Sequence, residues 1–236
     1  MKLPGKYSCN LVGGTKMTEY DLIIRNGFVV LPDEVKKTDI GIKDGVIKEI
    51  EQNLIAKGIE ERDADGLYIF PGLIDVHVHF NDPGRTEWEG IETGSRAAAI
   101  GGTTTVFDMP LNCSPSVTTV KNLHNKREYL TSKSYIDYAL WGGMTGNSVS
   151  NNEELTKMSE GIIAWKAFMS ESGIDDFPFV SPDQLKLAMK IAAQQNIILA
   201  LHAEWEEEIN NLTTFYKKQT GINERKAFLA SRPISA

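Results

Sequence analysis

Two histidines stand two positions apart in the segment DVHVH, at residues 75–79. Side chains at positions i and i+2 of a β-strand point to the same face, so His77 and His79 would lie side by side, with Asp75 next to them. Two imidazoles at the end of a strand can bind one metal ion, and a nearby carboxylate can orient one of them. The alternative is two unrelated histidines that alternate by chance, and the pattern favours the metal site.

A lysine lies inside an apolar run, because Lys166 is the only charged residue of the segment IIAWKAF, at 162–168. If this run is a buried strand, burial disfavours the ammonium and lowers the pKa of the lysine. The neutral amine could then act as a nucleophile, or react with CO₂ to form a carbamate. The sequence leaves open the alternative that Lys166 ends the strand and extends its ammonium to solvent.

A further histidine, His202, closes the apolar run at 197–202. One histidine in such a place is more often a packed or capping residue. However, three of the four histidines and Lys166 fall at the same end of predicted strands, where α/β enzymes build their sites. The remaining histidine, His124, lies in a polar helical stretch and is expected to be solvated. Asp108 follows another strand, where it could contact a substrate or simply begin a loop.

Strand-like runs alternate with helix-like stretches after Gly72, a pattern typical of βαβ units with a parallel sheet covered on both faces. Gly221 is a candidate break in the last helical stretch. The predicted strands are 73–79, 103–109, 135–141, 162–168 and 197–202, and the predicted helices are 87–100, 117–132, 152–160, 182–195 and 204–230.

Three segments of the chain differ in pattern. Residues 17–70 are expected to form a small antiparallel β domain, with tight turns at Asn26-Gly27 and Asp44-Gly45. Residues 1–16 form a polar leader that lacks the apolar core of a secretory signal and is expected to be disordered. Residues 71–236 carry the alternating elements, but a complete (β/α)₈ barrel needs about 250 residues. The length therefore fits an open five-stranded α/β sheet or the N-terminal part of a barrel.

The composition is that of an ordinary globular protein, with 41% hydrophobic and 24% charged residues and a net charge of −7. The acidic balance offers no basic surface for nucleic acid or anionic lipid. No apolar run reaches the about 18 residues of a membrane span. The two cysteines, Cys9 and Cys113, do not suggest a disulfide framework, and we expect a cytoplasmic location.

Several segments resemble, in order, those of the cyclic amidohydrolases of the amidohydrolase superfamily, which include dihydroorotase, hydantoinase (dihydropyrimidinase) and allantoinase. The similarity covers about residues 20–236, and the segments are most similar to those of the allantoinases. It implies an α/β fold, namely the N-terminal part of a (β/α)₈ metal-dependent hydrolase barrel with about five strands, preceded by half of a small composite β domain. The segments are FPGLIDVHVHFNDPGRTEWEG (70–90), DMPLNCSP (108–115), LWGGMTGN (140–147), WKAFMSESGIDDFP (165–178) and HAEW (202–205).

The resemblance also implies a metal centre. Two divalent ions, with zinc as the expected metal, would be bound by His77, His79, Lys166 and His202, and a carboxylated Lys166 would bridge them. The family adds another histidine and a catalytic aspartate on later strands, and the sequence supplies no histidine after His202. We therefore assign no catalytic residue and expect an incomplete portion, inactive alone, of a protein that forms a homo-oligomer, a tetramer in many of the proteins it resembles.

The expected reaction is hydrolysis of a cyclic amide, with allantoin opened to allantoate. Dihydroorotases similar to this chain have an arginine where Asn81 stands and an asparagine where Leu111 stands, and both bind the substrate carboxylate. Without them a buried anion would be unpaired, so a neutral ring is favoured. Asn81, Arg85 and Asn112 are the expected substrate-binding residues, although Arg85 could restore the positive charge. A hydantoinase, a dihydroorotase-like enzyme and a non-catalytic scaffold remain alternatives.

Overall fold

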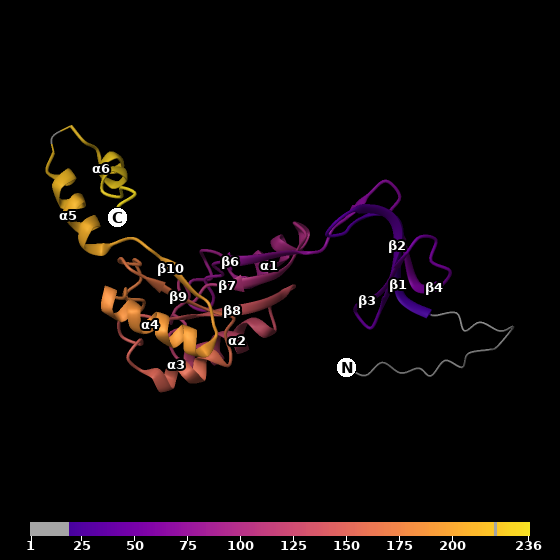
Figure 1. Cartoon of the computed structure of the whole chain (residues 1–236), viewed down its shortest axis with the longest axis horizontal. Coiled ribbons are helices and arrows are strands. Elements are labelled where there is room, and N and C mark those ends of the chain that lie inside the picture. Colours follow the sequence, from indigo (N-terminus) through magenta and orange to yellow (C-terminus); the bar gives the residue numbers. More distant parts are fainter. Residues whose placement is uncertain (1–18, 220) are drawn as a thin grey trace. The chain divides into compact units, whose positions relative to one another are not determined.

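The computed structural model describes residues 19–219 and 221–236, so the predicted leader at 1–16 lies outside the described residues. The chain divides into two compact units, Met1–Pro71 and Gly72–Ala236 (Figure 1). Each unit is built on its own five-stranded sheet. None of the helices in the described part of the chain is long and apolar enough to cross a membrane.

The first unit is a mixed sheet in which β1 (Glu19–Val30) pairs with three other strands. It runs antiparallel to β2 (Val35–Lys43) and parallel to β4 (Lys57–Asp63) and β5 (Tyr68–Ile69), while β3 (Val46–Glu51) pairs with β2. The prediction of a purely antiparallel unit was therefore wrong. The sequence analysis missed β4 because KGIEERD is almost entirely polar and shows no alternation of apolar residues.

The Asn26-Gly27 pair, predicted to be a hairpin turn, lies instead at a bulge within β1. Asn26 has a φ of 63°, and the register of β1 against β2 shifts at this point. A residue in the left-handed region is the usual start of one bulge type, so the same dipeptide fits either structure. The turn at Asp44-Gly45 is confirmed, since both residues have positive φ, 53° and 71°, as a two-residue type I′ hairpin requires.

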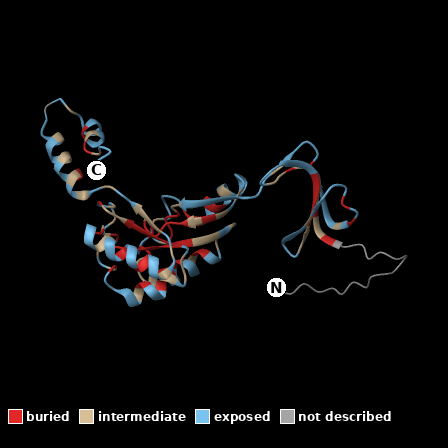
Figure 2. Cartoon of the chain, viewed as in Figure 1, coloured by how far each residue is buried: buried red, intermediate tan, exposed pale blue. Residues whose placement is uncertain are grey.

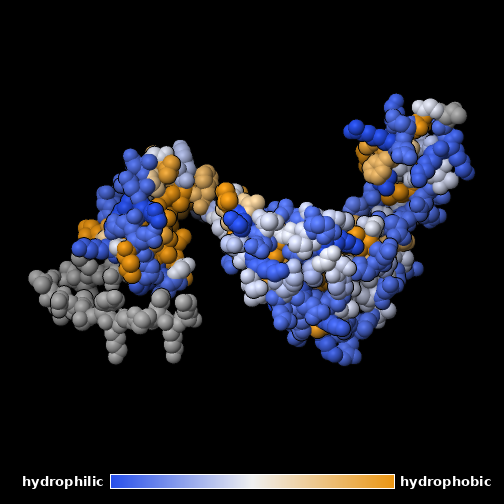
Figure 3. All heavy atoms as spheres, turned by 180° about the vertical axis from the view of Figure 1, so that it is seen from behind, coloured by the Kyte–Doolittle hydropathy of each residue, from blue (hydrophilic) through white to orange (hydrophobic). Residues whose placement is uncertain are grey.

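Part of the apolar surface of this sheet stays exposed. Orange patches mark hydrophobic residues on the first unit in Figure 3, at the left of that view. The exposed apolar residues of this unit include Ile55, Ile59, Leu67 and Phe70, each more than half accessible. The small cluster of Tyr20, Ile23, Leu54 and Ala56 is its buried core.

The second unit is a half-barrel of parallel strands in the order β10-β9-β8-β7-β6, with helices between successive strands (Figure 1). The predicted alternation of strands and helices is confirmed, with boundaries that shift by a few residues. The elements are β6 (Leu73–Val78), α1 (Ile91–Ile100), β7 (Thr103–Asp108), α2 (Val120–Thr131), β8 (Asp137–Gly143), α3 (Asn152–Ser159), β9 (Ala164–Phe168), α4 (Pro182–Gln195), β10 (Leu199–His202), α5 (Glu206–Lys217) and α6 (Glu224–Ala230).

Local signals set several helix boundaries. Ser181 begins α4 with a reciprocal capping box to Gln184, followed by proline at the first helical position. Asn151 caps α3 by accepting the backbone N–H of Glu154. The last predicted helical stretch is divided into α5 and α6, and Gly221 between them has a φ of 86°, which a helix interior does not allow.

The parallel sheet buries residues on both of its faces, as the red segments of its strands show in Figure 2. One face packs with the helices through a large cluster that includes Val106, Leu140 and Trp165. The other face, here called the inner face, carries the smaller cluster of Met109, Leu111, Trp141, Ala164 and Phe177. Side chains alternate between the two faces along a strand. A residue next to a member of the helix-side cluster therefore points to the inner face, and a residue next to a member of the inner-face cluster points to the helices.

Candidate functional site

His77 and His79 project from the carboxyl end of β6 toward the inner face. Val78 between them packs on the helix-side cluster, so the alternation places the two imidazoles on the opposite face. Their ring centroids are 5.4 Å apart and their planes are tilted by 52°. Asp75 shares this face, but its carboxylate accepts the backbone N–H of His77 at 3.1 Å rather than a ring nitrogen. The structure thus pairs the two imidazoles, as their spacing predicts.

Lys166 lies on the inner face of β9, where its neighbours Trp165 and Ala167 face the helices. Its side chain is buried, and burial lowers the pKa of its ammonium group. The ammonium lies 5.0 Å from the centroid of the Phe168 ring. Of the two predicted alternatives, the buried amine is therefore the one that the structure supports.

Lys166 acts on both histidines although three strand spacings separate β6 from β9. In a flat sheet that separation would be about 14 Å. Burial is the main cause that lowers the pKa of His77 and His79, and repulsion by the ammonium of Lys166 lowers both further. All three side chains lie on the inner face of the half-barrel, because Val78, Trp165 and Ala167 beside them pack with the helix-side cluster. Lowered pKa values keep the imidazoles neutral, with a nitrogen lone pair available to a ligand.

His202 ends β10 and pairs in register with Phe168. The two rings stack at 4.8 Å with 6° between their planes. His202 Nε2 lies 3.0 Å from one carboxylate oxygen of Glu204, and Arg232 Nε lies 3.3 Å from the other. Within residues 19–219 and 221–236, no group of three or more His, Cys, Asp or Glu side chains could hold a metal ion. His202 and Lys166 share a neighbour, because the His202 ring stacks on the Phe168 ring and the Lys166 ammonium lies 5.0 Å from the centroid of that ring.

One of the three expected substrate-binding residues, Asn112, borders His79, and a second, Arg85, contacts Asn112. The side-chain amide nitrogen of Asn112 lies 3.3 Å from His79 Nδ1. Arg85 donates from Nη1 to the backbone carbonyl of Asn112 at 3.1 Å. Asn81 behaves differently, because its buried side chain donates to the carbonyl of Glu89 at 3.3 Å. Asn81 therefore supports its own loop, whereas Arg85 and Asn112 join the loops that follow β6 and β7.

A cavity of about 310 Å³ lies among the loops that follow β6, β7 and β9. The carboxylate of Asp176 links two of these loops, because it accepts the backbone N–H of Ser116 at 2.7 Å and its hydroxyl at 2.8 Å. The cavity thus opens beside the same loops that carry Arg85 and Asn112. Its lining residues are Arg85, Ser114, Gly173, Ile174, Asp175 and Asp176.

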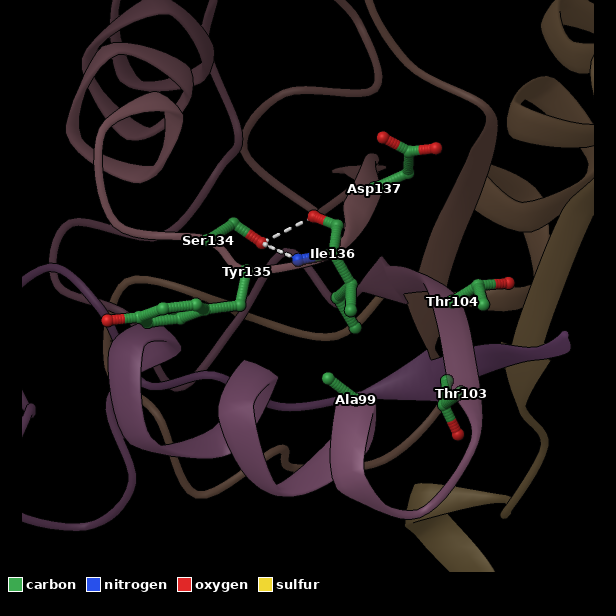
Figure 4. Close-up of a pocket in the computed structure, with 7 residues that line it drawn as sticks. All are labelled: Ala99, Thr103, Thr104, Ser134, Tyr135, Ile136 and Asp137. Carbon is green, nitrogen blue, oxygen red and sulfur yellow. Dashed lines mark hydrogen bonds between the residues drawn. The ribbon is translucent and has the colours of Figure 1, made fainter. Parts of the chain in front are cut away.

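Another cavity, of about 510 Å³, lies at the amino ends of β7 and β8 (Figure 4). The hydroxyl of Ser134 donates to the carbonyl of Ile136 at 2.6 Å. Strand direction separates this cavity from His77 and His79, which lie at the carboxyl ends. Its lining residues are Ala99, Thr103, Thr104, Ser134, Tyr135, Ile136 and Asp137.

The sequence analysis missed a buried ion pair near the site. Lys126 Nζ lies 2.8 Å from Asp108 Oδ2, on the helix side of the sheet. Asp108 therefore faces α2 rather than a substrate on the inner face. The spacing of Leu123, Lys126 and Leu130 places the lysine within the apolar stripe of α2, a signal that could have identified it. His124 is exposed, as predicted.

The sequence of this chain is similar to those of known proteins. The sequence model of the amidohydrolase family matches residues 68–232. Allantoinase of Desulfitobacterium hafniense (strain Y51) is 43% identical over 221 residues, which are 93% of this chain and 48% of that protein. Allantoinase of Bacillus velezensis is 44% identical over 223 residues, covering 92% and 47%. The chain thus spans about half the length of the curated relatives it matches.

The fold of this chain is also similar to solved structures. L-hydantoinase (dihydropyrimidinase) from Arthrobacter aurescens is similar with a TM-score of 0.84 and 29% identity, covering 92% of this chain and 48% of that one. A D-hydantoinase structure is similar with a TM-score of 0.74 and 31% identity, covering 89% and 46%. The resemblance predicted from the motifs is therefore confirmed.

Proposed function

The chain belongs to the amidohydrolase family, and from that premise we propose that it is part of a metal-dependent hydrolase that opens a cyclic amide ring, with allantoin as the substrate. The relatives named allantoinase and the neighbours named hydantoinase support this reaction class. The observation that supports the proposal is the pairing of His77 with His79 at the end of β6, with Lys166 buried on the same face of the half-barrel.

The donor set fits a divalent metal ion such as zinc. Imidazole nitrogen and carboxylate-type oxygen are ligands that zinc accepts, and a carboxylated lysine supplies the oxygen atoms. We propose that His77 and His79 bind one ion and that carboxylated Lys166 joins it to a second ion bound by His202. When bound, such ions polarise a carbonyl and lower the pKa of water. Burial of Lys166 favours the neutral amine that carboxylation requires.

Arg85 and Asn112 are proposed to bind the ring. A guanidinium has five N–H donors, and the contact with the Asn112 carbonyl uses only one of them. The others are available to the carbonyl oxygens of a substrate in the adjoining cavity. The amide of Asn112, next to His79, can orient the ring toward the histidines. These residues bind and orient the substrate, and we assign no general acid or base among the described residues.

A neutral ring is favoured by the environment of Leu111. This residue is buried in the inner-face cluster, where its side chain offers no hydrogen bond. Asn81, the other position that distinguishes the dihydroorotases, is bonded to the Glu89 carbonyl. An anionic carboxylate placed here would lose its hydration without gaining a partner from either residue. Allantoin avoids that cost, and hydantoin, the ring after which the hydantoinase neighbours are called, is the second candidate.

The substrate proposal is tested on the complete protein that carries this chain. We would assay allantoin, hydantoin, dihydrouracil and dihydroorotate under identical metal loading. Hydrolysis of allantoin with the highest kcat/KM is expected, whereas turnover of only the other three would reject allantoin. The resemblance also implies a homotetramer, which light scattering after size-exclusion chromatography would test, and the cytoplasmic location expected from the cysteines would be tested by localisation of the tagged protein.

A further inference from the structure

A fully buried ion pair lies behind the candidate metal-binding histidines. The side chains of Lys126 and Asp108 are 1% and 0% exposed, and their charged atoms are 2.8 Å apart. Among the described residues, Asp108 Oδ2 has no polar partner other than this ammonium. Desolvation offsets most of the attraction within such a pair, and apolar residues of similar volume often replace it without loss of stability. Stability alone therefore does not account for the pair.

Asp108 and the next residue, Met109, hold the backbone on both sides of His79. Asp108 Oδ1 accepts the backbone N–H of Phe80, the residue after His79, at 2.9 Å. The backbone N–H of Met109 donates to the carbonyl of Val78, the residue before His79, also at 2.9 Å. His79 is thus bracketed by two hydrogen bonds to consecutive residues at the end of β7.

Lys126 fixes those consecutive residues and the loop that follows them. Its ammonium binds the Asp108 carboxylate and donates to the Met109 carbonyl at 3.2 Å. Further along the same loop, the buried thiol of Cys113 donates to the Pro110 carbonyl at 3.6 Å. Asn112, whose amide lies 3.3 Å from His79 Nδ1, stands between Met109 and Cys113. One buried cation therefore holds Met109, which begins the loop segment whose Asn112 amide lies beside the His79 ring.

We propose that Lys126 is a positioning residue that fixes the imidazole of His79, through Asp108 and Met109 on the backbone side and through the Asn112 loop on the ring side. The inference rests on the proposed function, because it takes His79 as a metal-binding side chain. Lys126 itself lies on the helix side of the sheet and contacts neither the ring nor the inner face. Loss of its charge would leave Asp108 buried and unpaired, and would free the backbone that brackets His79.

Three variants separate positioning from simple stabilisation. Lys126→Met leaves the buried carboxylate without its cation. The double variant Asp108→Asn with Lys126→Met removes both charges, while an amide oxygen at position 108 can still accept the N–H of Phe80. Lys121→Met is the matched control, because Lys121 is an exposed residue of the same helix. Each protein is examined by thermal unfolding, zinc titration calorimetry and ¹H–¹⁵N NMR of the histidine rings.

The double variant should unfold close to the unaltered protein but bind zinc about 10- to 100-fold more weakly, as for other residues that orient metal ligands. Its His79 ring signals should shift or broaden, while those of exposed His124 stay in place. Lys121→Met should match the unaltered protein in every measurement. A double variant with unchanged zinc affinity and unchanged His79 signals would show that the pair only stabilises the fold and would overturn the proposal.

If the double variant does not fold, the Lys126→Arg variant tests the positioning role instead. Arginine keeps the positive charge at position 126. Its planar guanidinium cannot reproduce the contact that the one ammonium nitrogen of Lys126 makes with both the Asp108 carboxylate and the Met109 carbonyl. A shifted His79 ring and weaker zinc binding are expected, and unchanged values would refute the positioning role. If the unaltered chain binds no zinc, the proposed function fails, but the His79 signals of the metal-free variants still test the positioning role.

Discussion

Replacing Lys166 with methionine should stabilise the metal-free chain while weakening its metal binding. Lys166 is 6% exposed, and among the described residues its ammonium has one neighbouring partner, the face of the Phe168 ring, 5.0 Å away. A buried donor without a hydrogen bond costs about 1–3 kcal/mol, and methionine fills a similar volume without a polar group. The expected gain is therefore about 1–3 kcal/mol, or a rise in Tm of about 2–12 °C for a chain of this size.

Thermal unfolding in EDTA measures this gain, and calorimetric zinc titration measures the loss of binding. Lys190→Met is the matched control, because Lys190 is exposed on α4 and the change should alter stability by no more than about 0.5 kcal/mol. A Lys166→Met protein that is less stable than the unaltered chain in EDTA would refute the reasoning. It would mean that the lysine is satisfied in the fold and contributes to stability.

The same substitution has a defined pH dependence. Burial lowers the pKa of Lys166 in the folded chain below the ordinary value of 10.5, so the unfolded chain binds more protons between the two pKa values. The stability of the unaltered chain should therefore rise as the pH increases through the folded pKa toward 10.5. Lys166→Met removes this titration, so its advantage should shrink over that interval. An advantage that grows with pH would contradict the assigned cause.

Two further predictions concern the scaffold. Ser181→Ala should cost about 1 kcal/mol in urea unfolding, because it removes the capping box of α4, whereas Ser235→Ala at the surface should change stability little. Acid should destabilise the first unit, because hydrogen bonds from Arg25 and Asn26 lower the pKa of Glu61 and Asp63, respectively. That stabilisation is present above the unfolded pKa values and is lost as the pH falls through the folded ones, so the NMR amide signals of β1 should lose their dispersion on acidification. Signals that persist unchanged well below those values would contradict this account.

The sequence predicted the alternating strands and helices because their signals are periodic and local, whereas the barrel itself was implied only by the family resemblance. Apolar runs separated by amphipathic stretches define the strands and helices, and the alternation within DVHVH is enough to place His77 and His79 on one face. The turn at Asp44-Gly45 followed from the same kind of local rule. The direction of a side chain could be predicted from the sequence where it depends only on the strand that carries that side chain.

The features that the sequence did not predict depend on contacts between residues that are distant in the chain. Asn26-Gly27 satisfies the rules for a hairpin and for a bulge, and only continued pairing of β1 with β2 selects the bulge. Asp108 seemed free to contact a substrate until Lys126, on the following helix, supplied its counter-charge. The curvature of the half-barrel belongs to the whole sheet, and no single segment encodes it.

Zinc bound per chain, measured by inductively coupled plasma mass spectrometry after equilibrium dialysis, provides the decisive comparison. The unaltered chain should retain more zinc than a variant carrying His77→Ala and His79→Ala, while His124→Ala, at an exposed histidine, should retain as much as the unaltered chain. Equal zinc content in the unaltered chain and in the double variant would contradict the assignment of a metal centre to the inner face.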